Sequence, residues 1–475
     1  MGERPALSRL EHLTLAHVAV LVVGTTWAFG GQAEWVRPPI TWFGTLGVLL
    51  TVFALRDPRA LRDGRIRSLA WAWPVLAFNL FVLLGCLNPS FREVRFETEL
   101  NYAHVGGRPG IPSVVRPDLA LGALWRFDVL WLAGFNLALI IRQRRALRWL
   151  FIVMVVNAAV LAIFGTLQKL AHAKGIFFDA VTTPQVYFFA SFVYHNHWGA
   201  FMLLMLATCL GLVWHAGRRL STHDFFHSPA FGGVVVLLLL AVTVPLSGSR
   251  SSTILALGLL GVAFVIWLAR LIRTRRHHDE SIAPPIVGAL AAVALAAAAA
   301  WMVAGEMIAL RLSKTREQLT EMRERGTIGD RAQLYRNTWR MAQAKPWYGW
   351  GMGSYPQVFT RFFNTRSPRD KLPIFYNDAH NDWLQALAEH GFVGSALLAL
   401  AGIIPLRRLR TRHLVSPIPG HLLAGCALVL LYALLEFPLA NLAVVLCWWV
   451  CFYGAVHYAR LQDREGVPAR ADATY

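Results

Sequence analysis

The chain has 475 residues, of which 56% are hydrophobic and only 15% are charged, and its formal net charge is +19. Soluble domains carry roughly 25% charged residues, so this composition excludes an ordinary soluble domain and indicates helices that cross lipid. Arginine-rich cytoplasmic loops account for most of the positive charge, which therefore does not indicate nucleic acid as a partner. The five cysteines all lie in apolar stretches, and we interpret them as small core residues.

Apolar stretches of bilayer-crossing length follow one another along the whole chain. We predict an all-α polytopic membrane protein with about twelve transmembrane helices, because a helix needs roughly 20 apolar residues to cross. The stretches lie near residues 13–30, 38–55, 69–88, 119–141, 149–170, 197–214, 231–247, 253–272, 284–303, 381–405, 418–436 and 441–459.

The connections between these stretches alternate in character. One set is short and rich in arginine, near residues 56–67, 142–148, 218–219, 270–276 and 407–412. By the positive-inside rule, this set is predicted to be cytoplasmic, together with the N-terminus and the tail after Arg460. The opposite face, which is periplasmic in a Gram-negative host, carries the longer segments near 89–117, 171–196 and 304–380.

The segment 304–380 is the one large extramembrane part that the sequence predicts. It contains expected helices at 310–325 and 331–344, and then a glycine-rich stretch at 349–353. The predicted division of the chain therefore has three parts. They are helices one to nine (residues 1–303), the periplasmic helical loop (304–380), and helices ten to twelve with the tail (381–475).

The strongest local signal is the polar sequence at 378–384, where this loop meets the tenth predicted helix. Asn381, Gln385 and Glu389 are four residues apart and form one polar stripe, which in a membrane must face protein or water. His380 stands beside the stripe, and a histidine suits a general base because it titrates near neutral pH. A single interfacial histidine more often only bonds locally, so the residues alone leave both roles open.

A very short turn at residues 247–252 joins two predicted helices at the outer face. Arg250, at the outer face, is an exception to the positive-inside rule. Its neighbour Ser249 belongs to a Ser/Gly turn that can bind the oxygens of an anion. Arginine binds phosphate with a fork of donors, so we favour phosphate binding here over snorkelling to lipid headgroups. Arg331 begins a predicted helix, where the helix dipole disfavours a cation. This unfavourable position indicates that Arg331 has another role.

Other polar residues also lie near the outer ends of predicted helices. Lys169 ends the fifth helix and Asn196 opens the sixth, so both are candidates to line a headgroup site. The histidines on either side of Asn196 are two residues apart and do not share a helical face, which disfavours a metal pair. Arg126 and Asp128 lie within the fourth helix, and we expect them to pair with other helices or to face a cavity.

Several catalytic motifs are missing from the sequence. It has no P-loop, no GxSxG and no HExxH motif. Glu97 and Glu99 could hold a metal, but an ordinary loop is the simpler interpretation. We therefore predict cation-based chemistry with no metal and no cofactor.

Taken in order, these residues resemble the O-antigen ligase/polymerase family of bacterial membrane glycosyltransferases. The likeness spans about residues 247–394 and includes the large loop between the ninth and tenth helices. It rests on the turn Ser249-Arg250, on Arg331, Trp339, Pro346 and Gly349 to Tyr355, and on His380-Asn381, Leu384, Glu389-His390-Gly391 and Gly394. A departure from the family pattern is His-Asn-His at 195–197, where relatives often have Asn-Pro-Asn.

The resemblance implies a fold similar to class C glycosyltransferases and a donor glycan carried on undecaprenyl pyrophosphate. It implies that Arg250 and Arg331 contact the donor phosphates and that His380 is the catalytic histidine. The chemistry agrees, because a pyrophosphate leaving group needs charge neutralisation, while the acceptor hydroxyl needs a base.

We therefore predict an O-antigen ligase of the bacterial inner membrane, which transfers the glycan to a sugar hydroxyl of lipid A-core at the periplasmic face. The reaction is expected to be metal-independent and inverting, with His380 as general base. Arg250, Arg331 and Lys169 are predicted to bind the donor pyrophosphate, and the predicted supporting residues are Asn196, Ser249, Asn381 and Glu389.

The sequence leaves alternatives open. An O-antigen polymerase would use the same donor and a growing O-antigen as acceptor, and a protein O-oligosaccharyltransferase is a more distant alternative. A twelve-helix transporter belongs to another class, but the chain shows no two similar halves, and its polar residues gather at one face and not at mid-membrane.

Overall fold

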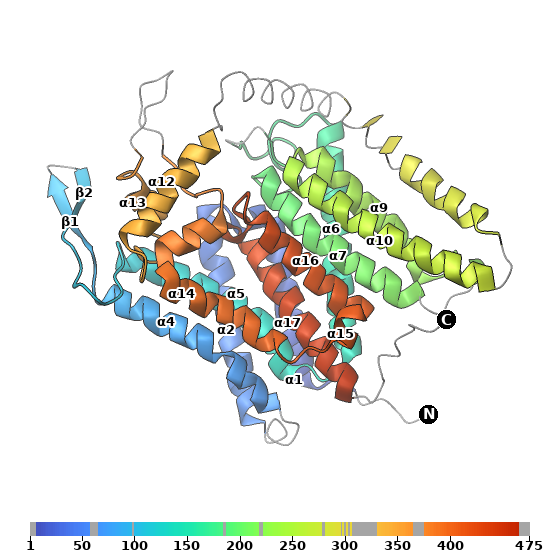
Figure 1. Ribbon diagram of the computed structural model, residues 1–475, viewed down its shortest axis with the longest axis horizontal. Coiled ribbons are helices and arrows are strands. Elements are labelled where there is room, and N and C mark those ends of the chain that lie inside the picture. The colour runs from blue at the N-terminus through green and yellow to red at the C-terminus, as the bar shows by residue number, and fades with distance from the viewer. Residues whose placement is uncertain are drawn as a thin grey trace.

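The computed structural model describes residues 6–57, 65–96, 99–183, 187–217, 222–277, 281–295, 297–298, 301–302, 305, 330–363 and 375–464. In this part the chain is a bundle of helices with one small β-hairpin at its edge (Figure 1). The helices of the N-terminal half are α1 (Arg9–Trp27), α2 (Arg37–Arg56), α4 (Trp73–Cys86), α5 (Pro117–Ile140), α6 (Arg144–Leu170) and α7 (His195–Gly217). Those that follow are α8 (Thr222–Phe225), α9 (Pro229–Ser247), α10 (Arg250–His277), α12 (Asp330–Ala344), α13 (Tyr355–Phe359), α14 (Asp382–Leu406), α15 (Thr411–Val415), α16 (Pro417–Tyr432) and α17 (Leu442–Arg464).

The membrane character predicted from the sequence is confirmed. Within the described residues, nine helices are long and apolar enough to cross a membrane: α1, Glu34–Arg56 (which includes α2), α5, α6, α7, α9, Arg250–Arg276 of α10, α14 and α17. Shorter apolar helices, α4, Ala283–Leu295 and α16, fall on the remaining predicted stretches. The protein is thus an all-α polytopic membrane protein, and the count of twelve crossings stays a prediction.

The bundle is built around α17. In an 18-residue segment of α17, 94% of the residues are buried, whereas in the corresponding segment of α10 only 11% are. α17 is therefore central and α10 is peripheral. α17 packs on α5, α7 and α16, and a Cβ at Gly134 of α5 would collide with the backbone of Trp449. Such small residues let membrane helices approach closely. α10 leaves apolar side chains such as Ile254 70% exposed, which indicates a surface that faces lipid.

Several described residues of the arginine-rich connections and of the adjoining helix ends meet at one end of the bundle. Arg142, between α5 and α6, forms an ion pair with Asp57 after α2 at 2.8 Å, and its backbone N–H donates to Glu11 of α1 at 2.8 Å. Arg460, near the end of α17, donates to Ser68 at 2.7 Å. We call this the arginine end, and we call the opposite end, which carries α12 and α13, the loop end (Figure 1).

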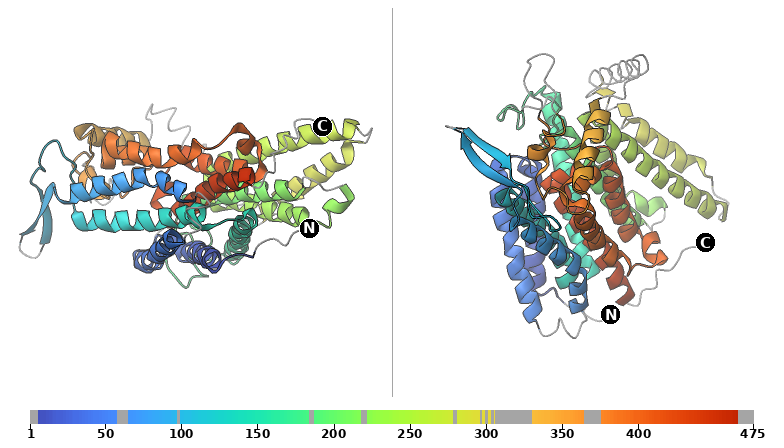
Figure 2. Two further views of the ribbon diagram at one scale, coloured as in Figure 1. Left: turned by 90° about the horizontal axis from the view of Figure 1, so that it is seen from below. Right: turned by 60° about the vertical axis from the view of Figure 1, so that its left-hand side comes forward.

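The loop end differs from the prediction in two places. Strands β1 (Phe91–Phe96) and β2 (Glu99–His104) form an antiparallel hairpin that projects from the bundle (Figure 2), where the sequence suggested only a loop. Gly391 interrupts α14 with φ 61° and ψ −167°, so the prediction of one continuous helix through Glu389 to Gly394 is wrong at this residue. The expected helix at 310–325 lies outside the described residues.

Candidate functional site

The glycine-rich stretch after α12 docks onto the break in α14. Gly349 and Gly391 both have positive φ, and a Cβ on either one would collide with the backbone of the opposite segment. This close approach satisfies the backbone groups that the break releases from α14. The bonds are Trp350 N to Ala388 O at 3.0 Å, Gly351 N to Glu389 O at 2.7 Å, Phe392 N to Pro346 O at 2.8 Å and Val393 N to Trp347 O at 3.0 Å.

Glu389 completes this docking with its side chain. The carboxylate is 7% exposed and accepts the backbone N–H of Gly353 at 3.0 Å and that of Tyr355 at 2.9 Å. Gln385, one turn earlier in α14, accepts the backbone N–H of Ala379 at 2.9 Å. The polar stripe therefore faces protein, which is one of the two environments expected for it, and Glu389 holds the loop in place.

Asn381 fixes the start of α14 against the end of α16. Its side-chain oxygen caps α14 by accepting the N–H of Leu384 at 3.0 Å, and its amide donates to the carbonyl of Leu434 at 3.0 Å. His380 precedes this cap with φ 52°, a left-handed conformation that non-glycine residues rarely adopt. The hydroxyl of Tyr335 in α12 donates to the His380 carbonyl at 2.8 Å. His380 is therefore held in this turn by Tyr335 and by the Asn381 cap that follows it.

A buried glutamate that the sequence analysis did not single out lies at the centre of the loop end. Glu436, between α16 and α17, is 3% exposed. One carboxylate oxygen accepts from the guanidinium of Arg331, which also donates to the Leu435 carbonyl at 3.1 Å. The other oxygen lies 3.3 Å from Nδ1 of His380 and accepts from the hydroxyl of Tyr194 at 3.4 Å. We call Glu436, Arg331, His380 and Tyr194 the Glu436 cluster.

The signal that could have found Glu436 is its position. It is a single carboxylate at the end of the eleventh predicted helix, and an ionisable residue at such a place usually has a functional partner. The partners come from α12 and from the turn before α14, which are distant in sequence. Their proximity could not be read from local patterns.

Phe437 packs the cluster against the rest of the loop end. Its ring contacts that of His380 edge to face at 4.6 Å and stacks on Tyr194 at 5.3 Å. On its other side it contacts His197 of α7 at 5.0 Å, and Nδ1 of His197 lies 3.2 Å from the side-chain oxygen of Gln32. The cluster is thereby connected to the segment between α1 and α2.

The remaining predicted site residues also lie at the loop end. Asn196 donates its amide to the Tyr194 hydroxyl at 2.7 Å, so it positions a member of the cluster. The Ser249 hydroxyl lies 3.0 Å from that of Tyr432, the last residue of α16 and one turn before Glu436. Arg250, next to Ser249, begins α10 and is exposed.

Lys169 lies in the last turn of α6 and places its ammonium 4.6 Å from the ring centroid of Phe188. It therefore lies against the segment that leads to Tyr194 and α7.

The neighbouring groups determine the protonation state of Glu436. Burial alone would raise the pKa of Glu436, but the hydrogen bond from His380 and the charge of Arg331 hold it below the ordinary value of 4.5. The carboxylate is therefore ionised at neutral pH and can only accept hydrogen bonds. Nδ1 of His380 is the ring nitrogen that faces this carboxylate, so Nε2 is the nitrogen that remains to face a ligand.

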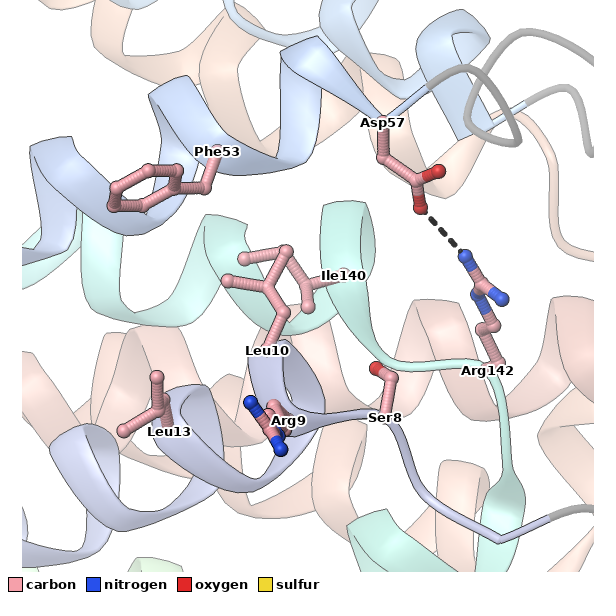
Figure 3. Close-up of a pocket in the computed structure, with 8 residues that line it drawn as sticks. All are labelled: Ser8, Arg9, Leu10, Leu13, Phe53, Asp57, Ile140 and Arg142. Atoms are coloured by element: carbon pink, nitrogen blue, oxygen red, sulfur yellow. Dashed lines mark hydrogen bonds and ion pairs between the residues drawn. The ribbon is translucent and has the colours of Figure 1, made fainter.

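A separate hollow of about 440 Å³ lies at the arginine end between α1, α2 and α5 (Figure 3). The Arg142–Asp57 ion pair borders it, and its other lining residues include Arg9 and Phe53. Because it opens at the opposite end of the bundle from Glu436, it is not part of the candidate site. Among the residues that the structure describes, no three His, Cys, Asp or Glu side chains are grouped as metal ligands.

Comparison with known families gives one match. The family model described as O-antigen ligase matches residues 234–399. This segment belongs to the O-antigen ligase/polymerase family. The predicted site residues Ser249, Arg250, Arg331, His380, Asn381 and Glu389 lie inside it.

Glu436, Asn196 and Lys169 lie outside the matched segment. No curated protein sequence matches the chain. The matched segment and the apolar helices together indicate a multi-pass membrane protein that is similar to the membrane glycosyltransferase-like enzymes of this family.

Proposed function

We propose that the chain is an O-antigen ligase. It transfers a glycan from undecaprenyl pyrophosphate to a sugar hydroxyl of lipid A-core, at the periplasmic face of the bacterial inner membrane. His380 is the general base, and Arg250, Arg331 and Lys169 bind the donor pyrophosphate. The proposal includes inversion at the anomeric carbon and no requirement for a metal.

One observation carries this proposal. Glu436 binds Arg331 through one carboxylate oxygen and His380 through the other, so a guanidinium and an imidazole are held on the same buried anion. The side chains of Arg331 and His380 are 49% and 27% exposed, so a ligand can reach both. A guanidinium beside an imidazole that can accept a proton is the pair that displacement of a pyrophosphate by an alcohol requires.

The reaction can be assigned to these groups step by step. Nε2 of His380 accepts the proton of the acceptor hydroxyl as its oxygen attacks the anomeric carbon. The bond from that carbon to the pyrophosphate oxygen breaks, and undecaprenyl pyrophosphate leaves with the bonding electron pair. Arg331, together with Arg250 from the turn between α9 and α10, neutralises the growing negative charge. Glu436 stabilises the imidazolium that forms, as a carboxylate does in a catalytic triad.

The test is a reconstituted transfer reaction. Purified protein is incubated with lipid-linked glycan and lipid A-core in the presence of a metal chelator, and the glycan–lipid A-core conjugate is measured. We expect conjugate to form. A folded protein that forms none, or forms it only after metal is restored, would overturn the proposal or its metal-independent part.

Gene deletion separates the ligase from the polymerase. Loss of a ligase leaves lipid A-core with no attached glycan, whereas loss of a polymerase leaves cores capped with a single repeat unit. We expect the uncapped core. Single-unit caps would assign the chain to the polymerase branch of the same family.

A further inference from the structure

Two arginines lie close together on α2 and α5, outside the Glu436 cluster. Arg37 is the first residue of α2, and Arg126 lies in the half of α5 nearer the loop end. The two helices pack along their lengths: the indole N–H of Trp125 donates to Thr45 at 3.0 Å, and the rings of Trp42 and Trp125 are 4.6 Å apart. This packing places Arg37 and Arg126 on neighbouring helices near the same end of the bundle.

The side chain of Arg126 extends toward the start of α2. Its guanidinium passes Gly122, one turn nearer the loop end, where an added Cβ would lie 3.4 Å from a terminal nitrogen. Gly44 of α2 packs on Val129 of α5, so in these parallel helices Gly122 is level with Arg37. The two guanidinium groups are close enough for their charges to repel each other.

Within the described residues, neither side chain has an anionic partner in an ion pair or a hydrogen-bond acceptor. Both residues are half-buried, and Nε of Arg37 is fully buried without a partner. Arg142 and Arg331, in contrast, each bind a carboxylate. Two partly desolvated like charges are unfavourable unless an anion binds them directly. Asp378, also a described residue, attracts Arg37 electrostatically but forms no ion pair with it, so the pair indicates a ligand that supplies the anion.

The pair lies beside the candidate site. Asp378 is within electrostatic range of both Arg37 and His380. Arg37 also follows Gln32 by five residues, and Gln32 contacts His197, which packs on Phe437 of the Glu436 cluster. A group bound by Arg37 and Arg126 would therefore lie near His380, on the α2–α5 side of the site.

We propose that Arg37 and Arg126 form a second anion-binding site, which holds a phosphate group carried by a lipid-anchored molecule. Arginine suits this ligand because its planar fork matches phosphate oxygens. Two sources share the chemistry: a phosphate on the acceptor glycolipid, which rests on the proposed ligase function, and the headgroup of an anionic phospholipid. The experiment below separates the two sources.

The experiment measures binding and needs no transfer activity. Arg37→Gln and Arg126→Gln are compared with wild type and with Arg336→Gln, which removes the same charge from an exposed position of α12. The first probe is lipid A-core in detergent, intact or enzymatically dephosphorylated, with affinity measured by thermophoresis. The second is phosphatidylglycerol retained in native mass spectrometry after purification. Arg126→Lys keeps the charge without the fork, and thermal unfolding identifies variants that fail to fold.

The two sources predict different results. If the acceptor supplies the phosphate, the site variants bind intact lipid A-core about tenfold more weakly, as loss of a charged hydrogen-bonding group implies, and bind the dephosphorylated form like wild type. If a headgroup supplies it, acceptor affinity is unchanged and the site variants retain less phosphatidylglycerol than Arg336→Gln. Folded site variants that match Arg336→Gln with both probes would overturn the proposal. Because neither probe requires catalysis, failure of the ligase assay would not affect this outcome.

Discussion

Two buried glutamates at the loop end, Glu389 and Glu436, have similar burial and opposite surroundings. Glu389 is 7% exposed and its carboxylate accepts backbone N–H groups from Gly353 and Tyr355. Glu436 is 3% exposed and its carboxylate binds the side chains of Arg331 and His380. Glu389 therefore bonds to backbone groups, whereas Glu436 bonds to a guanidinium and an imidazole that a ligand can also reach.

This difference separates fold from chemistry. The N–H groups that Glu389 accepts are fixed by the loop, so removing the carboxylate leaves buried donors unsatisfied and loosens the docking on α14. Removing the Glu436 carboxylate breaks no backbone hydrogen bond that the structure describes, but it removes the group that holds the Arg331 guanidinium and the His380 imidazole together. Mutating the two residues should therefore affect different properties, and this comparison can be tested directly.

The largest expected effect comes from the base itself. His380→Ala should lower the rate of glycan transfer by about 10²–10⁴-fold, the usual contribution of a positioned general base, while insertion and thermal unfolding stay close to wild type. The measurement is conjugate formed per folded protein. Full activity in folded His380→Ala would remove His380 from the mechanism and leave the Glu436 cluster without its proposed role.

Glu436→Gln should have the next largest effect on rate. We expect kcat to fall by about 100-fold, because the amide cannot stabilise the imidazolium and does not hold the Nδ1–H tautomer. Glu436→Asp should recover part of the loss, since it keeps the charge at a shorter reach. If Glu436→Gln changed only the amount of folded protein, with kcat and KM unaltered, Glu436 would be a fold residue like Glu389.

Glu389→Gln should mainly affect stability. Each carboxyl oxygen accepts one backbone N–H, and Gln replaces one of these oxygens with an NH₂ donor, so one buried N–H loses its acceptor. The free energy of unfolding should therefore fall by about 1–3 kcal/mol. Transfer per folded molecule should remain within about threefold of wild type, because Glu389 touches neither Arg331 nor His380. Thermal unfolding in detergent, together with activity normalised to folded protein, makes the comparison with Glu436→Gln direct.

The smallest effect is a dependence of stability on pH. Because the pKa of Glu436 is lower in the folded protein than its ordinary value of 4.5, its ionised form stabilises the fold. This contribution is fully present above pH 4.5 and is lost as the pH falls through the lower folded pKa. The difference in melting temperature between wild type and Glu436→Gln should be constant near neutral pH and shrink in acid. A difference that grew in acid would contradict the ion-pair interpretation.

The sequence predicted the part of the fold that local chemistry controls. Apolar length indicated the helices, and in the structure every predicted apolar stretch carries an apolar helix, although that of 284–303 is described only in part. The arginine-rich connections were predicted to share the cytoplasmic side. The contacts of Arg142 and Arg460 place several described helix ends together, and the side of the membrane that they face stays a prediction. These signals are local because both lipid solvation and charge asymmetry act on each segment separately.

Only the tertiary structure decided which polar groups meet. The sequence grouped Asn381 and Glu389 as one helical stripe. The break at Gly391 lets the loop dock on α14, and the Glu389 side chain then accepts the backbone N–H groups of Gly353 and Tyr355. The partner of His380 is Glu436, which follows α16. The two residues meet because the Asn381 side chain bonds the start of α14 to the Leu434 carbonyl at the end of α16. Hydrogen bonds and ion pairs between distant segments depend on packing, which no local pattern specifies.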